Sequence, residues 1–523
     1  MTPTTKIDHP RRTLRSPWVL LRGEASTLPG FSASEEVGRW RLLTRDGSRP
    51  AGFEVGEQGW SYRSRPFSHA AAWHATSADG SIRALGSDPA ILARAIGARP
   101  DPSSLVDDLV LGFRPDGRSP YEGISPCGSA DAMVYGPAGV EVVPQSNDPE
   151  PLATLGERIA ASMNDGACLE LTGGVDSRLL LALGIGSGGT PGRAFTIGDD
   201  GDPDVRIARA LADELGMEHR TLAIDADEAD EARLLDDTRA FVDESGQVCN
   251  AAAYGWLPSM FRRLEDFRSE QLSGVGGEVG EGFYYTGLDR LFELVNSPRL
   301  WLRARAVVDG GRWARLFEPG VCSRRLREVA RERTELYERK PWRLRTDDFY
   351  LHARIHGWAV PVIRASAAWY QPITPFLSAE YLAWSKSLSA QQRHGRAAQR
   401  EQIARLAPQI SGIPYAASLP PQRGGKLARR VAKARRLAGR VLPRPSEQPE
   451  RWAATAGSLM RSLDGADSVV DRLRTLDGVR VDRVAEVLAS DPRTSAHAIG
   501  ALLTMAHAID RLSDARPPDD RPA

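Results

Sequence analysis

Apolar and polar residues alternate in two different ways along this chain. From about residue 17 to 145 apolar residues recur at every second position in short runs such as VLLRGE and GRWRLLTRD, which break at Gly, Asp and Ser. This period of two predicts the short strands of a β-rich unit. Within it we expect one helix at residues 90–98, AILARAIGA, and a last strand at PAGVEVVPQ.

Beyond about residue 150 the pattern changes to alternating strands and helices. PLATLGERIAASM predicts a helix, ACLEL a buried strand and DSRLLLALGIG a second helix. GRAFTIG, DPDVRIARALADELG and HRTLAI continue as strand, helix and strand, and Gly216 is expected to end that helix with a left-handed cap. Such alternation predicts a parallel sheet with right-handed crossovers. A further helix is expected at about residues 248–265, and SEQLSGVGGEVGEGFYY predicts a strand, a glycine-rich loop and a helix.

The remainder of the chain, beyond about residue 290, has a mostly helical pattern. Residues 423–440 carry many Lys and Arg and no acid, and their apolar stripe predicts a surface helix. An acidic peptide or an RNA bound to that segment is the alternative interpretation. Residues 441–449 read as a linker, followed by short helices to about residue 512 and a frayed tail.

Length and composition limit the protein class. A chain of 523 residues exceeds the size of one ordinary core, so we expect more than one domain. The formal net charge is zero, which disfavours nucleic acid as a partner. The four cysteines are far apart and predict neither a disulfide scaffold nor a metal site, and we place Cys168 and Cys249 in the core. No signal-peptide pattern and no apolar run long enough for a membrane span occur, so a cytoplasmic protein without a membrane partner is expected.

The stretch LELTGGVDSRLLLALG, residues 169–184, carries the clearest candidate chemistry. Its central residues lie where a strand meets a helix, and in α/β sheets ligands collect at such carboxyl ends of strands. Gly173 and Gly174 allow a close approach of an anion, and the helix N-terminus offers N–H groups. Thr172 and Ser177 can donate hydrogen bonds to phosphate, and Asp176 fits if Mg²⁺ bridges its carboxylate to the phosphates. The sequence thus predicts a metal-bridged pyrophosphate cradle, while a tight turn with Asp176 as a helix cap is the simpler alternative.

TGGVDSR resembles the SGGxDS loop of the N-type ATP pyrophosphatases, and specifically of the asparagine synthetase family with its β-lactam synthetase and lasso-peptide cyclase members. The resemblance extends from about residue 150 to 430 through FTIGDDGDPDVRIARALADELGMEH, SGVGGEVGEGFYY and PITPFLSAEYLAWSKSLS. It implies an α/β fold, in which a β-rich, degenerate Ntn glutaminase-like domain precedes a parallel-sheet ATP-pyrophosphatase domain with a helical C-terminal part. We place these domains at residues 1–145 and 146–440, with a helical extension at 441–523.

The resemblance also assigns site residues and cofactors. It implies that ATP and Mg²⁺ bind, that Asp176 and Glu278 hold the metal, and that Asp204 is the acid before the second helix. The residues expected to contact ATP are Leu171, Thr172, Gly173, Gly174, Asp176, Ser177, Thr196, Ile197, Gly274 and Gly276.

Several positions depart from the family pattern. Residue 2 is threonine where glutamine-dependent members have a catalytic cysteine, so a glutaminase activity is not expected. Gln371 and Ser378 stand where the family has a glutamate and the aspartate of PFLD. Gln371 cannot act as a general base. Residues that could replace it are Tyr370, Glu380 and His356, of which Tyr370 is our catalytic candidate. Lys426 is the candidate for the late lysine that stabilises transition-state charge, with a solvated helix start as its alternative.

The leading hypothesis is an ATP-dependent synthetase that adenylates a carboxylate, releases pyrophosphate and transfers the acyl group to an amine. Because the first domain is degenerate, the amine is expected on a peptide or within the substrate itself, as in macrolactam or lactam formation. The expected partners are a small-molecule or peptide carboxylate, with a precursor peptide and its protease as the specific case. The alternatives are asparagine synthesis from free ammonia, a tRNA-modifying ATP pyrophosphatase and a non-catalytic nucleotide-binding scaffold.

Overall fold

A computed structural model describes the chain in segments. The described residues are 18–22, 32–37, 40–44, 53–56, 59–63, 72–127, 131–136, 139–144, 150–223, 228–264, 270–281, 313–337, 347–416, 450–462 and 466–513. Within them no helix is both long and apolar enough to cross a bilayer.

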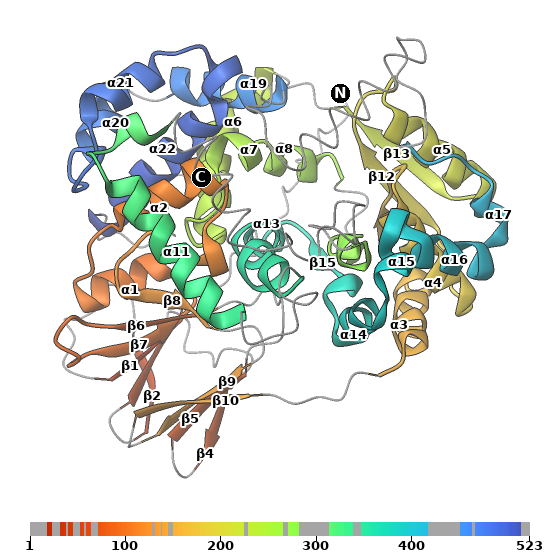
Figure 1. The fold of residues 1–523 in the computed structure, drawn as a ribbon, viewed down its shortest axis with the longest axis horizontal. Helices are drawn as coiled ribbons and strands as arrows, with labels where there is room; N and C mark the ends of the chain where they lie inside the picture. Colours follow the sequence, from red (N-terminus) through yellow and green to blue (C-terminus); the bar gives the residue numbers. More distant parts are fainter. Residues whose placement is uncertain are drawn as a thin grey trace, which may run out of the picture.

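The N-terminal part contains two antiparallel sheets, as the period-two pattern predicts (Figure 1). The first runs β2 (Ser32–Val37), β3 (Trp40–Thr44), β1 (Trp18–Arg22), β7 (Arg83–Gly86), β6 (Trp73–Thr76) and β8 (Ile124–Pro126). The second runs β10 (Gly139–Pro144), β9 (Asp131–Gly136), β5 (Gly59–Arg63) and β4 (Phe53–Gly56). The predicted helix is α1 (Pro89–Ile96), where Asp88 caps the first turn and Gly97 ends the helix in the left-handed conformation.

The predicted parallel sheet is confirmed. Its strands run in the order β13 (Glu218–Leu222), β12 (Arg193–Ile197), β11 (Cys168–Glu170), β14 (Glu270–Leu272) and β15 (Gln371–Ile373). The crossover helices α4 (Val175–Gly186) and α5 (Pro203–Leu215) follow β11 and β12 as predicted, and Gly216 has φ +64° after α5. Helices α3 (Leu152–Asn164) and α16 (Ala397–Leu406) pack on α4. Leu169 and Leu171 on β11 and Leu179–Leu183 on α4 supply the core between sheet and helices.

Further helices surround the sheets. They are α2 (Pro102–Val106), α6 (Glu228–Glu244), α7 (Ala251–Tyr254), α8 (Leu257–Arg262), α11 (Val321–Tyr337), α13 (Ala359–Ser366), α14 (Ala379–Ser387), α15 (Ala390–Arg393) and α17 (Pro408–Ser411). The helix predicted at 248–265 is wrong in extent, because the chain forms two short helices, α7 and α8, separated at Gly255. A β-carbon at Gly255 would lie 2.4 Å from Oγ1 of Thr238, so α6 packs directly against this break.

The C-terminal helices pack onto α6 and α7 rather than standing apart (Figure 1). They are α19 (Glu450–Ser462), α20 (Ala466–Leu473), α21 (Val481–Leu488) and α22 (Pro492–Ser513). The prediction of short helices fails for α22, which has 22 residues. Its apolar residues are buried over nearly the whole length, because the helix contacts α19 and α20, α7, and α1 of the N-terminal part.

Candidate active site

The order of the parallel strands reverses at β11, and this reversal indicates where a ligand would bind. Successive strands extend from β11 to β12 and β13 on one side, while β14 and β15 lie on the other. Ligands of such sheets bind beyond the carboxyl ends of the strands at the point of reversal, where neighbouring connections diverge and leave a crevice. Residues 171–177 follow β11 and residues 273–281 follow β14, so both predicted loops border this point.

The first of these, the TGGVDS loop at residues 172–177, is closed by its own hydroxyl groups. The N–H of Thr172 donates to Oγ of Ser177 at 3.1 Å, and the N–H of Gly174 donates to Oγ1 of Thr172 at 3.2 Å. The two hydroxyl oxygens lie 3.1 Å apart. Asp204 at the start of α5 accepts a hydrogen bond from the N–H of Gly173 at 3.0 Å. The loop therefore has a fixed turn, and its two predicted phosphate donors are engaged within it in this structure.

The second loop, at residues 273–281, needs its glycines because it lies against the first. A β-carbon at Gly277 would be 2.5 Å from Oδ1 of Asp176, and one at Gly274 would be 3.1 Å from the backbone nitrogen of Ser177. Gly276 has φ +93°, a conformation that side chains other than glycine rarely adopt. The glycine pattern of the sequence thus marks a place where two backbones and a carboxylate meet.

Asp176 and Glu278 bring two carboxylates together between the loops. Burial raises the pKa of both groups, and the negative charge of Asp176 raises that of Glu278 further. The hydroxyl of Tyr350 donates to Oε1 of Glu278, and the N–H of Gly276 donates to Oε2 at 3.0 Å. Two desolvated carboxylates of like charge favour a cation, and Mg²⁺ in proteins is commonly held by one or two carboxylates together with substrate phosphates. The pair therefore fits a phosphate-bound Mg²⁺. The described ranges offer no group of three or more acidic, His or Cys side chains for a metal.

Arg396 is a site residue that the sequence analysis missed. Its Nη1 donates to Oδ1 of Asp176 at 2.6 Å, and its Nε donates to Oε2 of Glu281 at 2.8 Å. It adopts a left-handed conformation with φ +62° at the start of α16, which is strained for a residue with a side chain. Arg396 is 220 residues from Asp176 in the sequence, so no local pattern could have indicated the contact.

Arg178, the last residue of TGGVDSR, holds a distant segment against the loop. Its guanidinium is fully buried and donates to the carbonyl oxygens of Ile413 and Pro414 at 2.6 and 2.9 Å. Farther along this segment, the N–H of Ala416 donates to the carbonyl oxygen of Gly173 at 3.0 Å. Lys426 lies outside the described residues, ten positions beyond a residue that touches the loop.

The predicted adenine contacts lie at the carboxyl end of β12. The side chain of Thr196 is buried, and its hydroxyl donates to the carbonyl oxygen of Leu171 at 2.6 Å and lies 2.8 Å from Nε2 of His219. Ile197 is partly exposed, whereas Leu171 is fully buried. Leu171 can therefore contribute its backbone only.

The predicted catalytic positions are spread around the sheet. Tyr370 precedes β15 and packs edge-on against Phe261 with ring centroids 4.8 Å apart. Gln371 donates to Glu270 at 3.0 Å at the amino end of the strands. Glu380 pairs with Arg158 at 2.8 Å. These placements bring Tyr370 and Gln371 to the sheet edge opposite the loops.

His356, the third candidate, lies at the interface with the N-terminal part. A β-carbon at Gly117 would be 2.5 Å from its carbonyl oxygen, and its ring is stacked on that of His352. Burial lowers its pKa to about 3, so the ring is neutral at pH 7.

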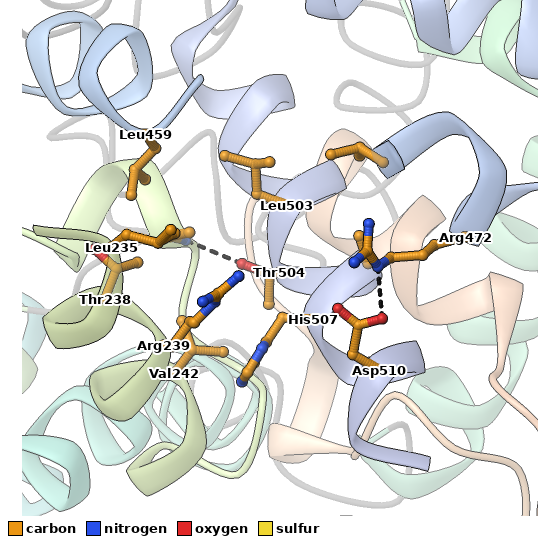
Figure 2. A pocket seen from close by; sticks show the side chains of 13 residues that line it. Leu235, Thr238, Arg239, Val242, Leu459, Arg472, Leu503, Thr504, His507 and Asp510 are labelled. Atoms are coloured by element: carbon orange, nitrogen blue, oxygen red, sulfur yellow. Dashed lines mark hydrogen bonds and ion pairs between the residues drawn. The ribbon is translucent and has the colours of Figure 1, made fainter. Parts of the chain in front are cut away.

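A separate pocket opens between α6, α7, α19, α20 and α22 (Figure 2). Its walls are mostly apolar, with Arg239, Arg472, His507 and Asp510 at their polar positions. None of its lining residues belongs to the two loops, so we assign it no part in the candidate site.

Comparison with known families agrees with this geometry. Residues 158–410 match the family model described as asparagine synthase. The match spans both loops, so this part of the chain is similar to a family of ATP-dependent ligases that form amide bonds. A search of curated proteins finds no match.

Proposed function

We propose that the protein adenylates a carboxylate with ATP and transfers the acyl group to an amine on a peptide or within the same substrate. The observation that carries this proposal is the pair of carboxylates of Asp176 and Glu278. They lie on two loops that border the point where the strand order reverses. ATP is a substrate in this reaction, and Mg²⁺ would neutralise the charge that develops on the leaving pyrophosphate.

The chain's own residues have distinct tasks in this scheme. Asp176 and Glu278 would hold the metal, and the N-terminal turn of α4 would face the phosphates. Arg396 would exchange its bond with Asp176 for one with a phosphate oxygen, because a guanidinium binds phosphate in the same forked geometry as carboxylate. Lys426, ten positions after Ala416 in the sequence, remains the proposed stabiliser of transition-state charge.

The acyl acceptor in this proposal differs from the ammonia that glutamine-dependent enzymes use. We infer a peptide or intramolecular amine because the N-terminal part, residues 1–145, lacks the expected catalytic cysteine at position 2. In this scheme that part is a degenerate glutaminase-like domain, and the carboxylate partner is a small molecule or a precursor peptide.

Pyrophosphate release tests the proposal. The protein is incubated with ATP, Mg²⁺ and a panel of carboxylates that contains the free amino acids and short peptides, with and without ammonium chloride. We expect carboxylate-dependent pyrophosphate and AMP in equal amounts, and an at least 100-fold loss in Asp176→Asn.

Asp213→Asn, an exposed change on α5, serves as the matched control and should leave the rate unchanged. ADP in place of AMP, or full activity of Asp176→Asn, would contradict the proposal. Stimulation by ammonium alone would redirect it to asparagine-type synthesis.

A further inference from the structure

Glu170, the last residue of β11, is an acid that the ATP chemistry does not use. Its strand neighbours Leu169 and Leu171 are fully buried on the α4 side of the sheet. Because side chains alternate along a strand, Glu170 lies on the opposite face, beside Cys168. It is partly exposed and lies at the carboxyl end of its strand, directly before the TGGVDS loop.

The partner of Glu170 comes from the neighbouring strand across the reversal point. Oγ of Ser273, the first residue after β14, donates to Oε2 of Glu170 at 2.7 Å. Within the described ranges this hydroxyl is its one hydrogen-bond partner, and no cation pairs with it. Burial raises the pKa of this carboxyl group, and a partly buried acid with a single neutral donor is unfavourable for folding. Its position beside the two candidate nucleotide loops therefore indicates a functional use.

The surroundings of Glu170 are apolar and aromatic. Cys168 and Phe195 form a cluster on this face of the sheet, against which Ile197 and Trp256 pack while remaining partly exposed. One carboxylate among aliphatic and aromatic side chains is suited to a primary alkylammonium group, which offers a charge to the acid and methylenes to the walls.

We propose that Glu170 binds the attacking amine in its ammonium form and removes a proton from it. This inference rests on the proposed function and adds to it the acceptor class, an alkylamine rather than ammonia. The ammonium nitrogen gives one proton to the Glu170 carboxylate. Its freed electron pair then forms the C–N bond as the C–O bond to AMP breaks, and the second proton leaves with the phosphate of AMP or with water.

A binding experiment tests the subsite without any reaction. n-Butylammonium chloride is titrated into the full chain, and tryptophan fluorescence reports binding because Trp256 packs against the cluster that contains Cys168 and Phe195. We expect saturation with the unaltered protein, at least tenfold weaker binding by Glu170→Gln, and at least tenfold weaker binding of ammonium chloride. Glu218→Gln, an exposed acid on β13, is the matched control and should bind like the unaltered protein. Equal affinities of the unaltered protein and Glu170→Gln would overturn the inference.

A kinetic experiment separates the proton transfer from adenylation. With a carboxylate that supports pyrophosphate release, the acceptor is either n-butylamine or hydroxylamine, which is unprotonated at neutral pH and needs no base. Glu170→Gln should retain pyrophosphate release and hydroxamate formation within about twofold, and lose n-butylamide formation by on the order of 100-fold or more. A parallel loss with both acceptors would show that Glu170 acts structurally. Absence of pyrophosphate from the unaltered protein would instead refute the proposed function.

Discussion

Burial changes the pKa of single side chains in this protein, and His356 is the clearest example. Its folded-state pKa of about 3 is lower than the value of about 6.5 expected in the unfolded chain, so the folded state binds fewer protons in between. Its stabilising contribution is complete above about pH 6.5 and is lost as the pH falls towards 3. We expect His356→Gln to lose this dependence, so that the difference in unfolding free energy between the two proteins changes by up to roughly 1.4 kcal/mol per pH unit.

Urea unfolding at pH 7 and pH 5 measures this difference. Gln391→Ala, a change at an exposed position without a titrating group, should unfold with the pH dependence of the unaltered protein. If the difference in unfolding free energy between the unaltered protein and His356→Gln were the same at pH 7 and pH 5, the ring would be protonated in the folded state.

At the scale of elements, the TGGVDS loop and the loop at residues 273–281 depend on each other for their geometry. Gly277→Ala would place a methyl group 2.5 Å from Oδ1 of Asp176, so the carboxylate must move. We expect an at least tenfold slower pyrophosphate release and a loss of stability of about 1–3 kcal/mol, as for overpacking elsewhere. Gly412→Ala, at a position with open space around it, should change neither quantity. Normal turnover by Gly277→Ala, measured in the same assay, would mean that Asp176 does not need its present position.

The sequence predicted the elements around the site well, because local patterns determine them. The strand at ACLEL, the helix after TGGVDS and the left-handed Gly216 all follow from periodicity and turn chemistry. The contacts that join these elements could not be predicted, because they link residues far apart in the chain. Arg396 reaches Asp176 across 220 positions, and Arg178 reaches Ile413 across 235. Glu170 did give a signal, as an acid inside an otherwise apolar strand, but only the sheet order shows that it faces Ser273.

For the whole molecule, α22 joins elements that are far apart in the chain. Arg511 near its end is almost fully buried and pairs with Asp88, the cap of α1, at 2.6 Å and with Asp243 of α6 at 3.0 Å. The hydroxyl of Tyr121 donates to the carbonyl oxygen of Ala508 at 2.9 Å. Composition and periodicity gave no indication that this helix contacts the N-terminal part, since such packing depends on the tertiary arrangement alone.

Two neighbouring charges on α22 should therefore differ greatly in their effect on stability. Arg511→Met leaves two carboxylates without their shared cation and should cost about 3–5 kcal/mol. Asp510→Asn breaks a pair with Arg472 whose side chains are 43% and 34% exposed, and should cost less than about 1 kcal/mol. Chemical denaturation of both variants measures this contrast, and similar losses would show that α22 does not join those elements as described.

The late position of α22 in the chain has a consequence for biosynthesis. Asp88 and its partner Arg511 are separated by 423 residues, and ribosomes add about 5–20 residues per second. On the order of 20–80 seconds must pass between the synthesis of the first partner and that of the second. Until α22 is made, Ala508 and Leu512 cannot cover the cluster of Val19, Trp73 and Ile91, so N-terminal sheets that fold earlier leave this apolar face exposed.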